Sequence, residues 1–443
     1  MKLWEKGIPT QKIIEEFTIG KDADLDLLLA EFDVLGNIAH AKMLESAGLL
    51  ETDELEALQR ELKNIYREIQ SGKFNIAGGV EDIHSQIELL LTQRAGDAGK
   101  KIHAGRSRND QILLDLRLFI RGEIQKVVFD TKTLFDILIS LSEAHKNALL
   151  PGYTHLQIAM PSSFGLWFSA YAESLVDDLS FLQAAFRIVN KNPLGSAAGY
   201  GSSFPLNRQM TTDLLGFDSL NYNVVYTQMG RGKTERIVSM ALSTLAATLG
   251  KFAMDVCLYM NQNFGFITFP AELTTGSSIM PHKKNPDVFE LIRAKCNKLQ
   301  ALPNEISLIT ANLPSGYHRD MQIIKEQFLP AFAEINAVLK MMAFMLPQVI
   351  VKEDILDDDK YSYLFSVDAV NELVKNGVPF RDAYKTVAHQ IEAGEFQPPK
   401  DVNHTHEGSI GNLCNEQIQA EMGEIIKGFE FDRIKKSIDE LLK

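Results

Sequence analysis

The sequence has few cysteines and lacks an N-terminal secretion pattern. Three cysteines occur in 443 residues, and Cys257, Cys296 and Cys414 form no closely spaced pair. A disulfide framework or a zinc cluster is therefore not expected, and a reducing cytoplasm fits this composition. Residues 1–6 lack a basic region followed by an apolar run, so no signal peptide is predicted.

An excess of positive charge is also missing. The chain has 45 Lys and Arg against 58 Asp and Glu, which gives a formal net charge of −13. This balance disfavours nucleic acid and anionic membranes as partners, and no uncharged apolar stretch is long enough to span a membrane. An anionic small molecule is not excluded as a substrate, because a site can be locally positive within an acidic protein.

Long helical patterns occupy the middle of the chain. Between residues 110 and 150 there is no proline and one glycine, and apolar residues recur at steps of three and four. This spacing predicts a helix of about 60 Å. Such a helix needs a long bundle to bury its apolar stripe, and we expect partner subunits to contribute to that bundle. Four further helical runs are predicted near 161–193, 234–263, 286–311 and 322–346. Strand-like alternation is scarce, so we expect little sheet.

The flanks of this region look different from its centre. Residues 1–105 contain shorter helical patterns, including 24–47 and 52–71, and a charged run at 357–360 marks a hinge before short segments broken by glycine and proline. We therefore predict an N-terminal helical domain, 1–105, a central five-helix bundle domain, 106–358, and a small C-terminal helical domain, 359–443.

A polar loop at 274–286 is the segment most suggestive of chemistry. It reads TTGSSIMPHKKNP, and its glycine and two prolines disfavour a helix. A glycine-hinged loop can close over a substrate, while its lysines and the N-terminus of the following helix offer positive potential to a carboxylate. On composition alone, a solvated connector without a chemical role is an equally good interpretation.

Two further polar clusters flank the long helix. Residues 103–111, HAGRSRNDQ, open it and have the donors to bind an anion, although a capped helix start with solvated arginines is the simpler interpretation. Residues 152–157, GYTHLQ, follow its end, and a single histidine such as His155 is more often structural than catalytic. His404 and His406 have no third ligand nearby in the sequence, so no metal site is predicted.

Taken together, these clusters resemble the three signature regions of the fumarase/aspartase superfamily. Residues 276–286, GSSIMPHKKNP, match its G-S-S-x-M-P-x-K-x-N-P pattern, and the doubled lysine is similar to the argininosuccinate lyases. Residues 103–111 and 152–157 resemble H-x-G-R-S-R-N-D-Q and G-Y-T-H-x-Q of that family, and 377–381 resemble its G-V-P-F-R. The resemblance extends from about residue 33 to residue 381.

The resemblance implies both a fold and a reaction. The fold is mainly α, with three domains and a central long-helix bundle that forms a twenty-helix core in a homotetramer, where each active site combines segments from different subunits. The reaction is that of a carbon–nitrogen lyase, an amidine-lyase of arginine biosynthesis, which reversibly eliminates fumarate from argininosuccinate and leaves L-arginine. The implied enzyme needs no cofactor and no metal.

The same resemblance implies individual site residues. The catalytic residues are His155, Ser277, Lys283 and Glu290. The substrate-binding residues are Ser107, Arg108, Asn109, Thr154, Asn285, Tyr317, Gln322 and Lys325. His84, from its Glu-Asp-Ile-His context, is a weaker candidate for binding at the edge of the substrate.

Physical chemistry makes sense of the implied roles. Ser277 matches the serine that abstracts a proton, and it is a base only if loop closure, Lys283 and nearby amide dipoles favour its alkoxide. His155 matches the histidine of proton transfer, and Glu290 the carboxylate that raises its basicity. Lys283 and Asn285 stabilise the negative charge that develops on the carboxylate oxygens. Which group protonates the departing nitrogen stays open, with His155 as one candidate.

Several positions depart from the family pattern. Asn37 stands where a substrate-binding serine is common, the usual S-D-R-D stretch is absent near 226–230, and residues 3–7 lack an arginine found in related chains. These departures leave open whether the substrate is argininosuccinate or an N-acylated form. The alternatives are another lyase of the superfamily, such as an adenylosuccinate lyase or a fumarase, a crystallin-like structural protein, and a helical interaction scaffold.

Overall fold

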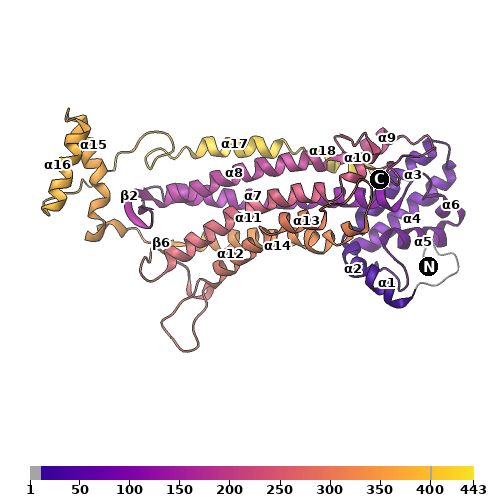
Figure 1. Cartoon of the computed structure of the whole chain (residues 1–443), viewed down its shortest axis with the longest axis horizontal. Helices are drawn as coiled ribbons and strands as arrows, with labels where there is room; N and C mark the ends of the chain where they lie inside the picture. Colours follow the sequence, from indigo (N-terminus) through magenta and orange to yellow (C-terminus); the bar gives the residue numbers. More distant parts are fainter. Residues whose placement is uncertain (1–10, 400–401) are drawn as a thin grey trace.

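The computed structural model describes residues 11–399 and 402–443, so the departure at residues 3–7 lies outside the described residues. Helices dominate the described chain, and six of them come before the long bundle. They are α1 (Lys12–Ile19), α2 (Asp22–Asp26), α3 (Ala30–Ser46), α4 (Thr52–Gln70), α5 (Ile83–Ala95) and α6 (Asp97–Lys101). Together with α9 (Arg208–Leu214) and α10 (Val224–Met229) they form one end of an elongated molecule (Figure 1).

The long helices run side by side through the middle of the molecule (Figure 1). They are α7 (Arg108–Ala144), α8 (Phe164–Val189), α11 (Lys233–Met260), α12 (Asp287–Leu299), α13 (Leu302–Ile309) and α14 (Ile324–Met345). The predicted stripe of α7 is buried against α8 and α14 in the main hydrophobic core. Full burial of such a leucine or isoleucine side chain stabilises the fold by roughly 1.5–3 kcal/mol.

Four more helices follow the bundle in the sequence. They are α15 (Ser366–Lys375), α16 (Phe380–Glu392), α17 (Asn415–Lys427) and α18 (Phe431–Leu442). The first two form a small separate core at the far end of the molecule, whereas α17 returns along α8 and α18 reaches α3 and α9 (Figure 1). The domain boundaries at 105 and 358 stay a prediction.

Two helical predictions need correction. The run predicted from 110 to 150 ends at Ala144, because the chain turns at residues 145–148 and continues as the strand β1 (Leu149–Thr154), which pairs with β2 (Gln157–Ser163). The run predicted from 286 to 311 is split into α12 and α13, because Pro303 lacks a backbone N–H and is tolerated only in the first turn of a new helix. The scarcity of sheet is confirmed: the described strands form three two-stranded pieces, completed by β3 (Lys191–Asn192), β4 (Ser219–Leu220), β5 (Ile267–Thr268) and β6 (Ile350–Val351).

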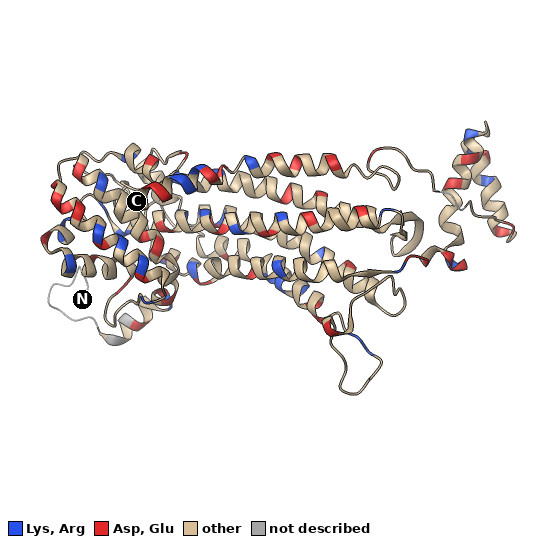
Figure 2. Ribbon diagram, turned by 180° about the vertical axis from the view of Figure 1, so that it is seen from behind, with Lys and Arg blue, Asp and Glu red and all other residues tan. Residues whose placement is uncertain are grey.

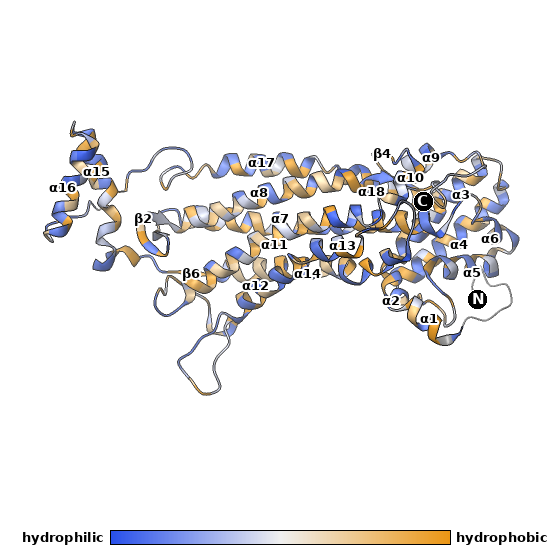
Figure 3. Cartoon of the chain, in the orientation of Figure 1, coloured by the Kyte–Doolittle hydropathy of each residue, from blue (hydrophilic) through white to orange (hydrophobic). Residues whose placement is uncertain are grey.

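The apolar composition of the bundle helices is explained by their packing. The segments Lys233–Met260 and Arg319–Gln348 are long and apolar enough to cross a membrane, but 56% and 50% of their most apolar windows are buried inside the molecule. Apolar and polar residues alternate around these helices (Figure 3), as expected for helices that bury one stripe. Charged residues are dense at the end formed by α1–α6 and sparser along the bundle (Figure 2).

Candidate active site

A cleft of roughly 260 Å³ opens where the N-terminus of α7 meets α2, α14 and the segments around residues 82 and 319. Five of the predicted substrate-binding residues line this cleft, and His84 lines it too. The five are Arg108, Asn109, Tyr317, Gln322 and Lys325. Tertiary folding therefore brings together side chains that are more than 200 residues apart in the sequence.

The start of α7 is both a capped helix and one wall of the cleft. The Ser107 hydroxyl accepts a hydrogen bond from the Asn109 amide at 3.3 Å. The side chain of Asp110 accepts from the Ser107 amide at 2.8 Å, so Ser107 and Asp110 form a capping box. Asp110 also accepts from the amides of Gly195 and Ala197, while burial raises its pKa to about 6. The cap fixes the direction in which α7 presents its first side chains to the cleft.

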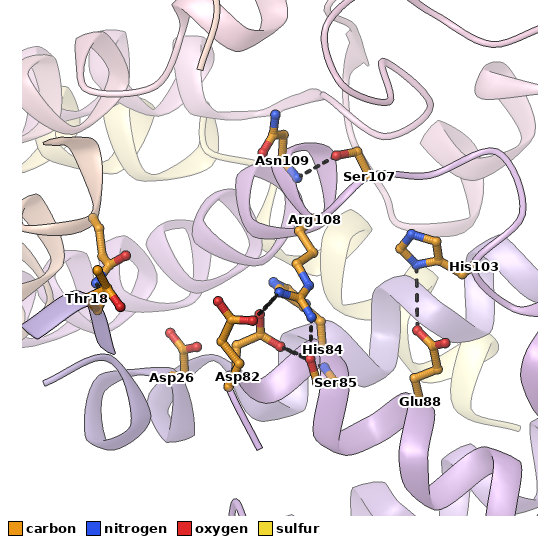
Figure 4. Close-up of polar contacts among 12 residues, drawn as sticks. Thr18, Asp26, Asp82, His84, Ser85, Glu88, His103, Ser107, Arg108 and Asn109 are labelled. Atoms are coloured by element: carbon orange, nitrogen blue, oxygen red, sulfur yellow. Dashed lines mark hydrogen bonds and ion pairs between the residues drawn. The ribbon is translucent and has the colours of Figure 1, made fainter. Parts of the chain in front are cut away.

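The arginines beside this cap are not solvated, unlike in the simpler interpretation of the sequence. The Arg108 guanidinium donates to Glu81 Oε2 at 2.8 Å and to Ser85 Oγ at 2.7 Å, and it lies 3.3 Å from Asp82 (Figure 4). Arg106 is buried. A guanidinium held by several acceptors in this way has a fixed orientation, which suits it to recognise a carboxylate.

Lys325 lies on the opposite wall and meets two carboxylates. Its Nζ is 2.7 Å from Asp26 Oδ1 and 2.8 Å from Asp22 Oδ1. Burial raises the pKa of Asp22, and Lys325 opposes this rise. The sequence analysis missed both aspartates, although their spacing of four residues places them on one face of α2.

Gln322 and Arg319 hold the first helix against the cleft. The amide of Gln322 donates to the carbonyl of Thr18 at 2.9 Å, and Arg319 donates to the same carbonyl at 3.0 Å. Both bonds satisfy the C-terminal end of α1, where backbone carbonyls lack helical partners. Ile19 consequently lines the cleft as well.

Arg231 is a further cleft residue that the sequence analysis missed. It forms a buried ion pair with Glu235 at 2.9 Å and donates to the carbonyl of Met321 at 3.1 Å. The sequence analysis noted that the S-D-R-D stretch is absent near residues 226–230, but it did not consider the arginine that follows them.

Thr154 and His155 lie on an exposed hairpin beyond the other end of α7. The turn between β1 and β2 consists of His155 and Leu156, with φ of 54° and 58°. Two residues with positive φ match the twist of a tight hairpin, but they strain side chains other than glycine or asparagine. Gly152 is needed nearby, because a Cβ there would approach the carbonyl oxygen of Met160 to 2.7 Å. A strained, exposed histidine is compatible with a catalytic role.

The loop at 274–286 projects from the side of the bundle ahead of α12 (Figure 1). Its base is closed by the Asn285 amide, which donates to the Thr275 carbonyl at 2.8 Å, and by the Asn285 side chain, which donates to the Gly276 carbonyl at 3.2 Å. The Ser277 hydroxyl accepts from the amides of Ile279 and Met280 at 3.3 and 3.1 Å. Lys283 is exposed on this loop, and Glu290 is exposed in the first turn of α12.

One chain does not bring all the predicted residues together. Ser107 stands at the start of α7 and the hairpin follows its end, and a helix of 37 residues spans about 56 Å. The cleft and the hairpin consequently lie at opposite ends of the bundle (Figure 1). The groups predicted for catalysis, His155, Ser277, Lys283 and Glu290, all lie outside the cleft, as do Ser107, Thr154 and Asn285.

Comparisons with known proteins agree on one family. The family model described as Lyase matches residues 3–301. The argininosuccinate lyases of Parabacteroides distasonis and Bacteroides thetaiotaomicron are 65% and 63% identical over 441 residues, which cover 100% of this chain and 99% of each relative. A solved structure of EDDS lyase in complex with formate has the same fold, with a TM-score of 0.76, 20% identity and coverage of 98% of this chain and 94% of that chain.

Proposed function

This chain belongs to the argininosuccinate lyases of the lyase family, and from that premise we propose that it splits argininosuccinate into L-arginine and fumarate. The observation that carries the proposal is the cleft, which has charges of both signs on facing walls. Argininosuccinate carries several carboxylates together with a guanidino group and an amino group. Arg108 and Asn109 suit the carboxylates, whereas Asp22 and Asp26 suit the cationic groups.

The proposed reaction starts with a proton removed from the succinyl carbon beside a carboxylate. We assign this step to Ser277, and its hydroxyl oxygen already accepts two backbone N–H groups, from Ile279 and Met280. These dipoles would stabilise a negative charge on the oxygen, and Lys283 would add a positive charge nearby. A free serine is a poor base, and these amides would make its alkoxide easier to form.

The following step breaks the bond between carbon and the guanidino nitrogen. The electron pair left by the proton forms the double bond of fumarate, and the electrons of the broken bond leave with the nitrogen, which takes up a proton to give arginine. We assign Lys283 and Asn285 to the charge that accumulates on the carboxylate oxygens, and His155, with Glu290 to raise its basicity, to proton transfer. Ser107, Thr154 and Asn109 hold the succinyl carboxylates, while Tyr317, Gln322 and Lys325 bind the substrate's periphery.

We further propose that the chain works as a homotetramer with active sites shared between subunits. Exposed catalytic segments at the hairpin and at the loop need a cleft from another chain, because their own cleft is at the other end of α7. Large apolar side chains on the outside of the bundle support this assembly, for example Phe129 and Leu308, which are 72% and 69% exposed. Such residues suit a helix-to-helix interface that extends the bundle.

The proposed setting is arginine biosynthesis in the cytoplasm. Cys257, Cys296 and Cys414 are all free thiols, which fits a reducing compartment.

An absorbance assay for fumarate tests the proposal. The purified chain is given argininosuccinate, adenylosuccinate, malate or aspartate in separate reactions. Fumarate release from argininosuccinate, at a rate at least a hundredfold above that from the others, is the expected result. Release from one of the other three alone would contradict the substrate, and no release from any would contradict the enzymatic function.

A further inference from the structure

A chain of buried polar side chains leads from the segment before α7 to the cleft. Arg106 Nη2 donates to Asn37 Oδ1 at 2.8 Å, and Asn37 Nδ2 donates to Asp33 Oδ2 at 2.9 Å. His84 Nδ1 is 2.7 Å from Asp33 Oδ1 and completes the chain. All four residues are buried, so these hydrogen bonds are poorly screened by water. The order Arg106, Asn37, Asp33, His84 ends at the cleft, which His84 lines.

Asn37 has a different use here from the one suggested by related sequences. The resemblance implied a substrate-binding role for this position, but Asn37 is buried and does not line the cleft. Its amide bridges Arg106 and Asp33 by accepting from one and donating to the other. A serine hydroxyl is shorter, so it would not span both partners without a shift of the backbone.

The contact with Asp33 fixes both the ring and the charge of His84. A carboxylate that accepts from Nδ1 sets the orientation of the imidazole and favours its protonated form. Among the described residues, Nδ1 is the only ring nitrogen of His84 with a hydrogen-bond partner. His84 also lines the cleft, so the second N–H is available to a ligand there.

Charges from three elements surround the ring. Asp33 comes from α3, Asp115 from α7, with Oδ2 3.7 Å from Nδ1, and Asp82 from the N-cap of α5. Burial opposes a charge on His84, but these carboxylates outweigh it and raise the pKa of His84 to about 10. Arg106 also interacts with Asp33 and Asp115: burial lowers the pKa of its guanidinium, and these two carboxylates oppose that fall.

Asp33, His84 and Asp115 are residue types that can also bind a metal cation. The geometry instead favours a proton between His84 and Asp33. Ligand atoms of Asp33, His84 and Asp115 lie within 4.8 Å of one another. The nitrogen that would bind a metal is the one that faces Asp33 at hydrogen-bond distance. A divalent ion would have to displace that proton close to the buried guanidinium of Arg106.

On the basis of the proposed function, we propose that Asp33 is a positioning residue for His84. Supported by Asn37 and Arg106, it holds His84 as a cationic donor at the cleft wall, where the free N–H binds a carboxylate of the substrate. The proposed ligand is a dicarboxylate or tricarboxylate with a guanidino group, and His84 contacts one of its acidic ends.

Steady-state kinetics of argininosuccinate cleavage between pH 6 and pH 9 test this inference. His84→Gln removes the donor cation, so KM should rise at least tenfold at every pH, with a smaller change in kcat. Asp33→Asn keeps the shape and removes the charge, so the pKa of His84 should fall. This variant should resemble the unaltered chain at pH 6 and His84→Gln at pH 9. The double variant should equal His84→Gln, because Asp33 acts through the ring.

Asn37→Ser is a milder change that leaves both charges in place. It should raise KM at pH 9 by a smaller factor than Asp33→Asn does and leave KM at pH 6 unchanged. The inference is overturned if Asp33→Asn has the same relative KM at both pH values, if the double variant shows additive effects, or if Asn37→Ser has no effect at any pH. Stoichiometric Mn²⁺ or Zn²⁺ bound by the unaltered chain and lost in Asp33→Asn would also overturn it, in favour of a metal site.

A readout without substrate separates this inference from the proposed function. A chain that releases no fumarate contradicts the proposed function only. The pKa of His84 lies above its unfolded value, so its stabilisation is complete below about pH 6.5 and is lost as the pH rises towards 10. The melting temperature should therefore fall less between pH 6.5 and pH 9.5 in His84→Gln and Asp33→Asn than in the unaltered chain. Equal falls in all three chains would overturn the inference.

Discussion

Among single residues, Ser277 combines a half-buried position on the loop with two backbone amides directed at its oxygen. Replacing it with alanine removes the proposed base and leaves the loop backbone unchanged. Ser277→Ala should lower kcat by about 10³-fold or more, with little change in KM or in the melting temperature. Fumarate absorbance and thermal unfolding are the measurements.

The neighbouring hydroxyl provides a matched control for this change. Ser278 is exposed on the same loop, and its hydroxyl has no hydrogen bond within the described part of the chain. Ser278→Ala should retain kcat within about threefold, because it removes no positioned catalytic group. Equal losses in the two variants would mean that the loop, and not the Ser277 hydroxyl, determines the rate.

Lys325 offers a residue-scale test of stability. Its ammonium is buried between Asp22 and Asp26, so Lys325→Met leaves two carboxylates without their cation. We expect a loss of about 3 kcal/mol in the free energy of unfolding at pH 8. The loss should be smaller at pH 5, because removal of the cation raises the pKa of Asp22 further and its carboxyl group can then take up a proton. Urea unfolding at the two pH values measures both effects.

An exposed lysine on the same helix is the control for Lys325. Lys340 lies 3.7 Å from Asp130 with its side chain largely in solvent. Lys340→Met should change the free energy of unfolding by less than about 1 kcal/mol, as is usual for exposed ion pairs. A pH-independent loss in Lys325→Met would contradict the proposed burial of charge.

At the scale of elements, substitutions in the turn of the hairpin distinguish the effect of backbone strain from that of the imidazole. Both turn residues have positive φ, and asparagine adopts this conformation more readily than histidine or leucine does. His155→Asn and Leu156→Asn should each keep or slightly raise the melting temperature. Activity should fall by about 10²-fold or more in His155→Asn and stay near normal in Leu156→Asn. Equal losses of activity would assign the effect to the turn and not to the imidazole.

The elements also differ in how far their sequence predicted them. The apolar stripe of α7 was predictable because successive turns bury the same face, and residues such as Leu116, Ile124 and Leu134 are buried as expected. The end of α7 at Ala144 was not predictable, because residues 145–150 contain neither glycine nor proline, and the pairing of β1 with β2 holds only the last two of them. Pro303 indicates the break between α12 and α13. The helical periodicity of the sequence continues across it, so the two helices were predicted as one.

At the scale of the whole molecule, shared active sites predict complementation between inactive variants. Ser277→Ala and His155→Asn each disable a different segment, so a tetramer mixed from both can contain some sites with an intact set. Denaturing the two variants together and refolding them should restore part of the activity that neither has alone. Light scattering should give four times the mass of 49.6 kDa for the assembled protein.

Two outcomes would contradict an active site shared between subunits. A monomer with full activity, or mixtures that never exceed the activity of the separate variants, would mean that one chain completes its own site. Variants within one segment, such as Ser277→Ala mixed with Lys283→Met, serve as the control. They should not complement each other, because both belong to the loop at 274–286.

The sequence by itself determined the helical class, the apolar stripes and the three polar segments, because helical spacing and a dense signature are properties of neighbouring residues. It also indicated the charge at the start of α7. Only the tertiary structure decided which charges meet: Lys325 with Asp22 and Asp26, and His84 with Asp33. These partners are 51 to 303 residues apart, and no local pattern encodes which buried charge another will neutralise.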